Sequence, residues 1–96
     1  MPLETRPWDM TESLRDETAI AAYIEAALED GDPGLVAAAI GDIARARGMA
    51  QIAKETGRSR ESLYRALSDR GNPELATLMG VLKALGLQLS VKPAGT

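Results

Sequence analysis

The stretch of residues 48–67, GMAQIAKETGRSRESLYRAL, combines a narrow apolar stripe with a run of basic and polar side chains. Ile52 falls on the inner face of a first short helix, Gly57 stands where the chain must turn, and Leu63 falls on the inner face of a second helix. The outward positions of the second helix are Arg60, Glu61, Ser62, Tyr64, Arg65 and Ser68. This pattern predicts a helix-turn-helix whose second helix enters the major groove of DNA.

The side chains at the start of this second helix suit contacts with DNA. A guanidinium can bridge O6 and N7 of guanine, and we expect Arg60 and Arg65 to project together into the duplex. Ser59 caps the helix, and both its hydroxyl and the helix N-terminus favour a phosphate. Two structural alternatives stay open: Ser59 acts only as a cap, and Tyr64 packs against the preceding long helix.

The net charge of −3 speaks against nucleic acid as a partner, but the charges are unevenly distributed. Residues 1–44 carry ten acidic and two basic side chains, whereas residues 45–70 carry seven basic and three acidic ones. DNA binding requires a local basic surface that displaces counterions from phosphates, and the basic block coincides with the predicted helix-turn-helix. The alternative is an ordinary solvated helix face on which the arginines are incidental.

The composition of the 96 residues favours one small helical domain. Since 45% of the residues are hydrophobic and none is phenylalanine, the core must consist of alanine, leucine and isoleucine, which suits closely packed helices. The chain lacks cysteine and histidine, so we expect neither an enzyme nor a metal site nor a cofactor. Without a signal region or an apolar run of roughly 20 residues, we expect a cytoplasmic protein with no membrane partner.

Capping signals and apolar spacing predict an extended arm over residues 1–15 and a domain of five helices over residues 16–96. Aspartate or asparagine followed by proline marks two helix starts, because the polar side chain caps the helix and proline suits its first position. Besides the two motif helices, the predicted helices are residues 17–29 capped by Asp16, Asp32–Pro33 to Gly48, and Asn72–Pro73 to Gly86. The expected inner-face residues are Ile20, Ile24, Ala27 and Leu28, then Val36, Ala39, Ile40 and Ile43, and then Leu75, Leu78, Met79, Leu82 and Leu85.

Residues 87–92 alternate apolar and polar side chains, which predicts a short half-buried β-strand. A strand needs a partner for its backbone groups, and the sequence predicts no second strand. We therefore expect antiparallel pairing with a second copy, giving a homodimer that presents two recognition helices to successive half-sites on DNA. The alternative is a tail folded back as an irregular extension.

The order of these segments resembles known families. Residues 42–91 resemble the Xre/Cro-like helix-turn-helix domains, and residues 4–92 are similar to addiction-module antidote proteins, the antitoxins of type II toxin–antitoxin pairs. The second resemblance rests on ETRPWD, AAYIEAALEDGDPGLVAAAIGDIARARGM and GNPELATLMGVLKALGL, in that order along the chain. It implies a compact all-α, five-helix Xre/Cro-like domain with an extended N-terminal arm and a short C-terminal β-strand.

The resemblance also implies two activities. Antitoxins of this kind bind and silence a small toxin, usually an RNA-cleaving protein of the RelE-like fold. They also commonly bind the operator of their own two-gene unit and repress it. The alternatives are a stand-alone Cro-type repressor without a toxin partner and a protein-interaction module that has lost DNA binding.

The family's recognition helix matches residues 59–65 here. The residues expected to contact DNA are Gln51, Arg58, Ser59, Arg60, Ser62, Tyr64 and Arg65. Arg58 stands where such motifs usually hold an apolar residue, so its guanidinium should extend outward, where it can add a phosphate contact. Gln51 occupies a position that the wider family often uses near DNA, although the first motif helix is shorter here.

The extended arm is the expected site of toxin binding. Its candidate residues are Pro7, Trp8, Asp9 and Leu14. A tryptophan anchor on such an arm suits a partner's pocket, and the acidic first half of the chain complements a basic RNA-binding toxin. The alternative is that Trp8 packs onto the first helix and completes the protein's own core.

Overall fold

The computed structural model describes residues 16–95 and shows five helices in that range. They are α2 (Glu17–Asp30), α3 (Pro33–Arg47), α4 (Met49–Thr56), α5 (Arg60–Ala66) and α6 (Leu75–Ala84). The described residues therefore form an all-helical unit, as the composition predicts. The predicted arm, residues 1–15, lies outside the described residues.

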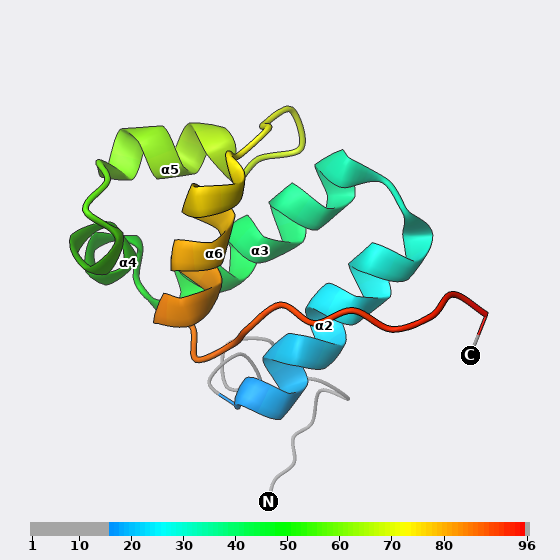
Figure 1. The fold of residues 1–96 in the computed structure, drawn as a ribbon. Coiled ribbons are helices and arrows are strands. Elements are labelled where there is room, and N and C mark those ends of the chain that lie inside the picture. The colour runs from blue at the N-terminus through cyan, green and yellow to red at the C-terminus, as the bar shows by residue number, and fades with distance from the viewer. Residues whose placement is uncertain (1–15, 96) are drawn as a thin grey trace, which may run out of the picture.

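The boundaries of α2 and α3 follow from local capping, as the sequence predicts. The Asp16 carboxylate accepts a hydrogen bond from the backbone N–H of Thr18 at 2.9 Å, and Asp32 accepts one from Gly34 at 3.1 Å. Gly31 ends α2 in the left-handed conformation with φ 85°, which a residue with a Cβ rarely adopts. The short turn brings α3 back against α2 (Figure 1).

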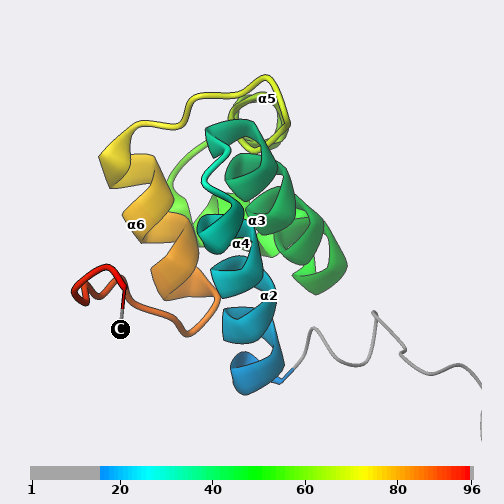
Figure 2. The ribbon, with the colours of Figure 1, turned by 90° about the vertical axis from the view of Figure 1, so that its right-hand side faces the viewer.

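Helix α3 is the centre of the fold, because α2, α4 and α5 all pack against it. The two views show α5 and the loop that follows it at one end of the molecule, and the start of α2 at the other (Figures 1 and 2). The charges are also divided between elements. Helix α2 carries four acidic residues and no basic one, whereas the segment 45–70 around α5 carries the basic block.

The core is aliphatic, as the composition predicts, and every described helix contributes to it. Burying one such side chain contributes about 1.5–3 kcal/mol, so the core holds the short helices α4 and α5 in place through their inner faces. The buried side chains of the cluster are Ile20, Ile24, Ile40, Ile43, Ala44, Met49, Ile52, Ala53, Leu63, Leu67, Val81, Leu82 and Leu85. Half-buried Val36 and Leu78 pack against them.

The predicted start and inner face of the last helix are partly wrong. Helix α6 begins at Leu75 rather than at Asn72–Pro73, and its N-cap is Glu74, whose side chain makes no capping hydrogen bond. The inward stripe of α6 runs through Thr77, Val81 and Leu82, which leaves Leu75 and Met79 mostly exposed at 64% and 52%. Leu28 is also exposed at 52%, because the inward stripe of α2 runs through Ile20, Ile24 and Ala27.

The predicted C-terminal strand is not present in the described chain. The backbone N–H of Leu87 bonds to the Leu82 carbonyl at 2.8 Å, and Gly86 adopts φ 82°, so the chain turns away sharply after α6. Residues 87–95 then run irregularly beside α2 (Figure 1). In the single chain no neighbouring strand supplies the hydrogen bonds of a ladder, so this segment follows the alternative of a folded-back tail.

Candidate nucleic-acid interface

Helices α4 and α5 are joined by a tight turn of three residues. Gly57 has φ 72° and ψ 21°, and its backbone N–H bonds to the Ala53 carbonyl. The backbone N–H of Ser62 then donates to Ser59 Oγ at 3.0 Å, so Ser59 is the N-cap of α5. Leu63 is fully buried and fixes the inner side of α5 to the core. The turn and both caps therefore stand where the sequence predicts them.

The basic side chains of α5 point away from the core. Arg60 and Arg65 are exposed, as is Ser59, whereas Ser62 is half-buried. A helix turns by about 100° per residue, so the side chains of Arg60 and Arg65, five positions apart, point in directions about 140° apart. By this geometry Arg65 lies near the middle of the exposed face, and Arg60 lies on one flank.

The flank that carries Arg60 also carries Tyr64, which contacts the long helix α3. Cζ of Arg45 lies 5.9 Å from the centroid of the Tyr64 ring, within the range of a cation–π interaction. The Tyr64 residue as a whole remains 42% exposed. The alternative for Tyr64, contact with the preceding long helix, is therefore seen, and the ring keeps a solvent-facing side as well.

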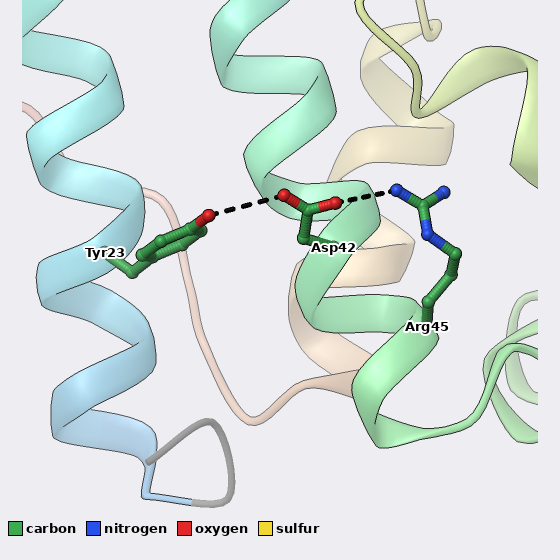
Figure 3. A network of polar contacts seen from close by, with 3 residues as sticks. All are labelled: Tyr23, Asp42 and Arg45. Atoms are coloured by element: carbon green, nitrogen blue, oxygen red, sulfur yellow. Dashed lines mark hydrogen bonds and ion pairs between the residues drawn. The ribbon is translucent and has the colours of Figure 1, made fainter. Parts of the chain in front are cut away.

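A polar network extends from Arg45 to α2 (Figure 3). Nη2 of Arg45 donates to Asp42 Oδ1 at 2.8 Å, and the hydroxyl of Tyr23 donates to Asp42 Oδ2 at 3.3 Å. Partial burial raises the pKa of Tyr23, and the neighbouring Asp42 carboxylate raises this pKa further. The network therefore joins α2, α3 and α5 through side chains on one side of the molecule.

Arg58 and Gln51 both have partners within the chain. Nη2 of Arg58 lies 3.9 Å from Oε1 of Glu74, and the Arg58 side chain is 37% exposed. Its guanidinium thus extends away from the core, as expected. Nε2 of Gln51 donates to Glu55 Oε2 at 2.7 Å along α4, and a primary amide has a second N–H donor and a carbonyl acceptor besides this bond.

Two arginines near α5 were not among the predicted contact residues. Arg45 reaches α5 from α3, and Arg70 lies on the loop after α5, beside Arg65 and Ser62 around one groove. The sequence shows both only as members of the basic block. Both lie just outside the motif in sequence, and helical spacing does not predict which way their side chains point.

Residues 16–95 hold neither a metal site nor a membrane-spanning helix. No group of three or more His, Cys, Asp or Glu among them could hold a metal ion, and none of the described helices has the length and apolar character needed to cross a membrane. The predicted toxin-binding residues Pro7, Trp8, Asp9 and Leu14 lie outside the described residues.

Comparison with known proteins identifies the family. A family model described as "Probable addiction module antidote protein" matches residues 4–93, nearly the whole chain. The chain belongs to this family. A protein of Haemophilus influenzae strain Rd, described as an uncharacterized protein, is 47% identical over 92 residues, which is 96% of this chain and 95% of the relative. No solved structure matches the chain.

Membership of the antidote family agrees with the resemblance seen in the sequence. An addiction module antidote is the antitoxin of a toxin–antitoxin system, so the family implies a cognate toxin as partner. Such antidotes are typically regulatory proteins without catalytic activity.

Proposed function

We propose that this antidote-family protein neutralises a small RelE-like RNA-cleaving toxin by direct binding and represses its own operon through DNA. In this proposal α4 and α5 form an Xre/Cro-like helix-turn-helix, and α5 is the recognition helix. The observation that carries the proposal is the position of α5: Leu63 anchors its inner side, while Arg60 and Arg65 face solvent. A rigid helix with free guanidiniums is what major-groove readout requires.

The two arginines would have different tasks, because they point in directions about 140° apart. Arg65 lies near the middle of the exposed face and would meet base edges in the groove floor. Arg60 lies in the first helical turn on the flank near Tyr64 and would meet a base edge or phosphate at the side of the groove. Ser59, Ser62 and Arg58 would add phosphate contacts, and Gln51 would add a contact from α4.

In this proposal the protein binds DNA as a homodimer in the cytoplasm. Leu89 and Val91 are exposed at 46% and 98%, and antiparallel pairing of residues 87–92 with a second copy would give these apolar side chains and the backbone a partner. Dimeric proteins of this kind read half-sites about 34–36 Å apart. The proposal therefore predicts an operator with approximate two-fold symmetry.

The operator experiment compares the DNA upstream of the gene with a scrambled duplex of equal length and composition. Binding is measured by fluorescence anisotropy at several salt concentrations. We expect the upstream duplex to bind at least about 10³-fold more tightly. Equal affinity for both duplexes would contradict sequence-specific recognition of the operator. It would show instead that the basic surface binds DNA without regard to sequence.

Toxin binding is assigned in this proposal to the arm, with Pro7, Trp8, Asp9 and Leu14 as contacts. The experiment co-expresses the protein with the product of the neighbouring reading frame and scores rescue from growth arrest and a co-purifying complex. Deletion of residues 1–12 should abolish the complex without changing the melting temperature of the protein. A lowered melting temperature would instead show that Trp8 completes the protein's own core.

The same co-expression separates this proposal from a stand-alone Cro-type repressor. Both proteins would use the recognition helix, but only the antitoxin needs a neighbouring toxin. A neighbouring product that is harmless and does not co-purify, together with intact operator binding, would favour the stand-alone repressor.

A further inference from the structure

A groove of about 320 Å³ lies between α5, the loop that follows it and the first turn of α6. We call it the arginine groove. The residues that give it its chemical character are Arg58, Ser62, Arg65, Arg70, Glu74 and Thr77. It is continuous with the exposed face of α5, because Ser62 and Arg65 belong to both.

The arginine groove is cationic. It is lined by three guanidiniums and one carboxylate, that of Glu74, which is 79% exposed and lies 3.9 Å from Arg58. Three guanidiniums against one carboxylate leave the groove with a net positive charge. Arg65 and Arg70 make no ion pair with any residue in the range 16–95, so their charges remain available for a ligand.

The backbone around the groove adds to this preference for an anion. Helix α6 has ten residues, and no side chain makes a capping hydrogen bond at its N-terminus, so its first N–H groups add partial positive charge beside the arginines. The loop that carries Arg70 is held close to α5. A Cβ at Gly71 would collide with the Ala66 carbonyl oxygen, so only glycine allows the loop to approach α5 closely enough to place Arg70 beside Arg65.

We propose that the arginine groove binds one phosphate of the DNA backbone, and that Arg70 is a phosphate ligand. Guanidiniums bind phosphate oxygens through paired N–H donors, and three of them around a hollow suit a compact anion better than the planar edge of a base. This inference rests on the proposed DNA binding of α5. It adds a residue outside the recognition helix that would fix the register of α5 on the duplex.

The test measures the salt dependence of DNA binding for Arg70→Gln. Each phosphate contact contributes about 0.9 to the slope of log K against log salt concentration. The variant should therefore lose about 1 from this slope, which corresponds to about fivefold weaker binding at 0.15 M salt. The loss should be equal for the upstream and the scrambled duplex, since a phosphate carries no base sequence.

Two further variants serve as controls. Arg70→Lys retains the charge and should keep the slope. Lys83→Gln removes one positive charge from the last turn of α6, away from the groove, and should leave both slope and affinity unchanged. Equal melting temperatures of the wild type and Arg70→Gln will show that the fold is intact.

The outcomes separate this inference from the proposed function. If the wild type binds the upstream duplex specifically and Arg70→Gln keeps the full slope, the groove assignment is overturned and DNA binding stands. A wild-type protein that binds neither duplex overturns both. An Arg70→Gln slope equal to that of the wild type, combined with saturable shifts of the Gly71 amide signal in inorganic phosphate, would assign the groove to a free anion and also overturn the inference.

Discussion

The guanidinium of Arg45 on α3 lies over the ring of Tyr64 on α5, with 5.9 Å between Cζ and the ring centroid. Arg45 also donates to Asp42 at 2.8 Å, which fixes the direction of its side chain. The orientation of α5 is thus set from two sides: Leu63 holds it to the core, and Tyr64 holds its flank to α3. A surface interaction therefore contributes to the position of the proposed recognition helix.

Loss of the aromatic ring should measure this interaction. Tyr64→Leu removes the cation–π contact while it keeps an apolar side chain, and it should lower the free energy of unfolding by about 0.5–1 kcal/mol. Tyr64→Phe retains the ring and should stay close to the wild type. Urea denaturation of the three proteins provides the comparison, and equal loss in both variants would show that the hydroxyl, rather than the ring face, matters.

Single and double substitution of the two α5 arginines should separate their tasks. Arg65→Ala should weaken binding to the upstream duplex by about 1–3 kcal/mol and relax base preference at one position in each half-site. Arg60→Ala should affect a different position, because its side chain points about 140° away. The double variant should lose operator binding with an unchanged circular dichroism spectrum, and retained sequence-specific binding by that variant would refute the assignment of α5.

The short helix α5 should depend strongly on its one buried side chain. Leu63→Ala empties a fully buried position and should lower the free energy of unfolding by about 2–5 kcal/mol. Met79→Ala is the matched control, since Met79 is 52% exposed and its loss should change stability by no more than about 0.5 kcal/mol. Thermal denaturation followed by circular dichroism measures the stability of both variants. Similar losses of stability would contradict the burial of Leu63 or the exposure of Met79.

The polar network should leave a signature at high pH. The pKa of Tyr23 is raised above its ordinary value of 10.0 in the folded protein, by partial burial and then by Asp42. The protonated phenol is thus favoured in the folded state, and its contribution to stability is complete below about pH 10 and declines as the pH rises through the raised pKa. Urea denaturation between pH 8 and 11 should show a smaller decline for Tyr23→Phe than for the wild type. An equal decline in both would refute the role of Tyr23.

Local signals in the sequence predict most of the fold. Asp16, Asp32 and Ser59 act as caps because each bonds to a backbone N–H two or three residues ahead, an interaction that depends on neighbours in sequence alone. Gly57 is equally local, since its positive φ is a property of the turn. These positions divide the chain into helices, and the boundaries of α2 and α3 are correct to within one residue. Helix α5 ends at Ala66, two residues before Ser68, which the pattern placed on the same helix.

The errors concern contacts that sequence spacing does not determine. Asn72–Pro73 looks like a helix start, yet the loop continues to Glu74. The buried face of α6 includes Thr77 and Val81, because the way this helix packs on the core selects its inner residues and apolar spacing alone does not. Arg45 and Arg70 lie beside α5 only because α3 and the loop after α5 fold back on it. The strand at residues 87–92 was predicted from alternation, but a strand also requires a neighbour.

The separation of charge between α2 and the α5 end gives the molecule an electrical polarity. If α5 binds DNA as proposed, a duplex would attract the basic block and repel α2, which carries four carboxylates. Collisions through α2 should then separate quickly, and the protein should arrive with its proposed recognition helix turned towards the duplex. The net negative charge of the chain at first argues against a nucleic-acid ligand. In this proposal, however, the acidic residues would help to orient the protein as it approaches DNA.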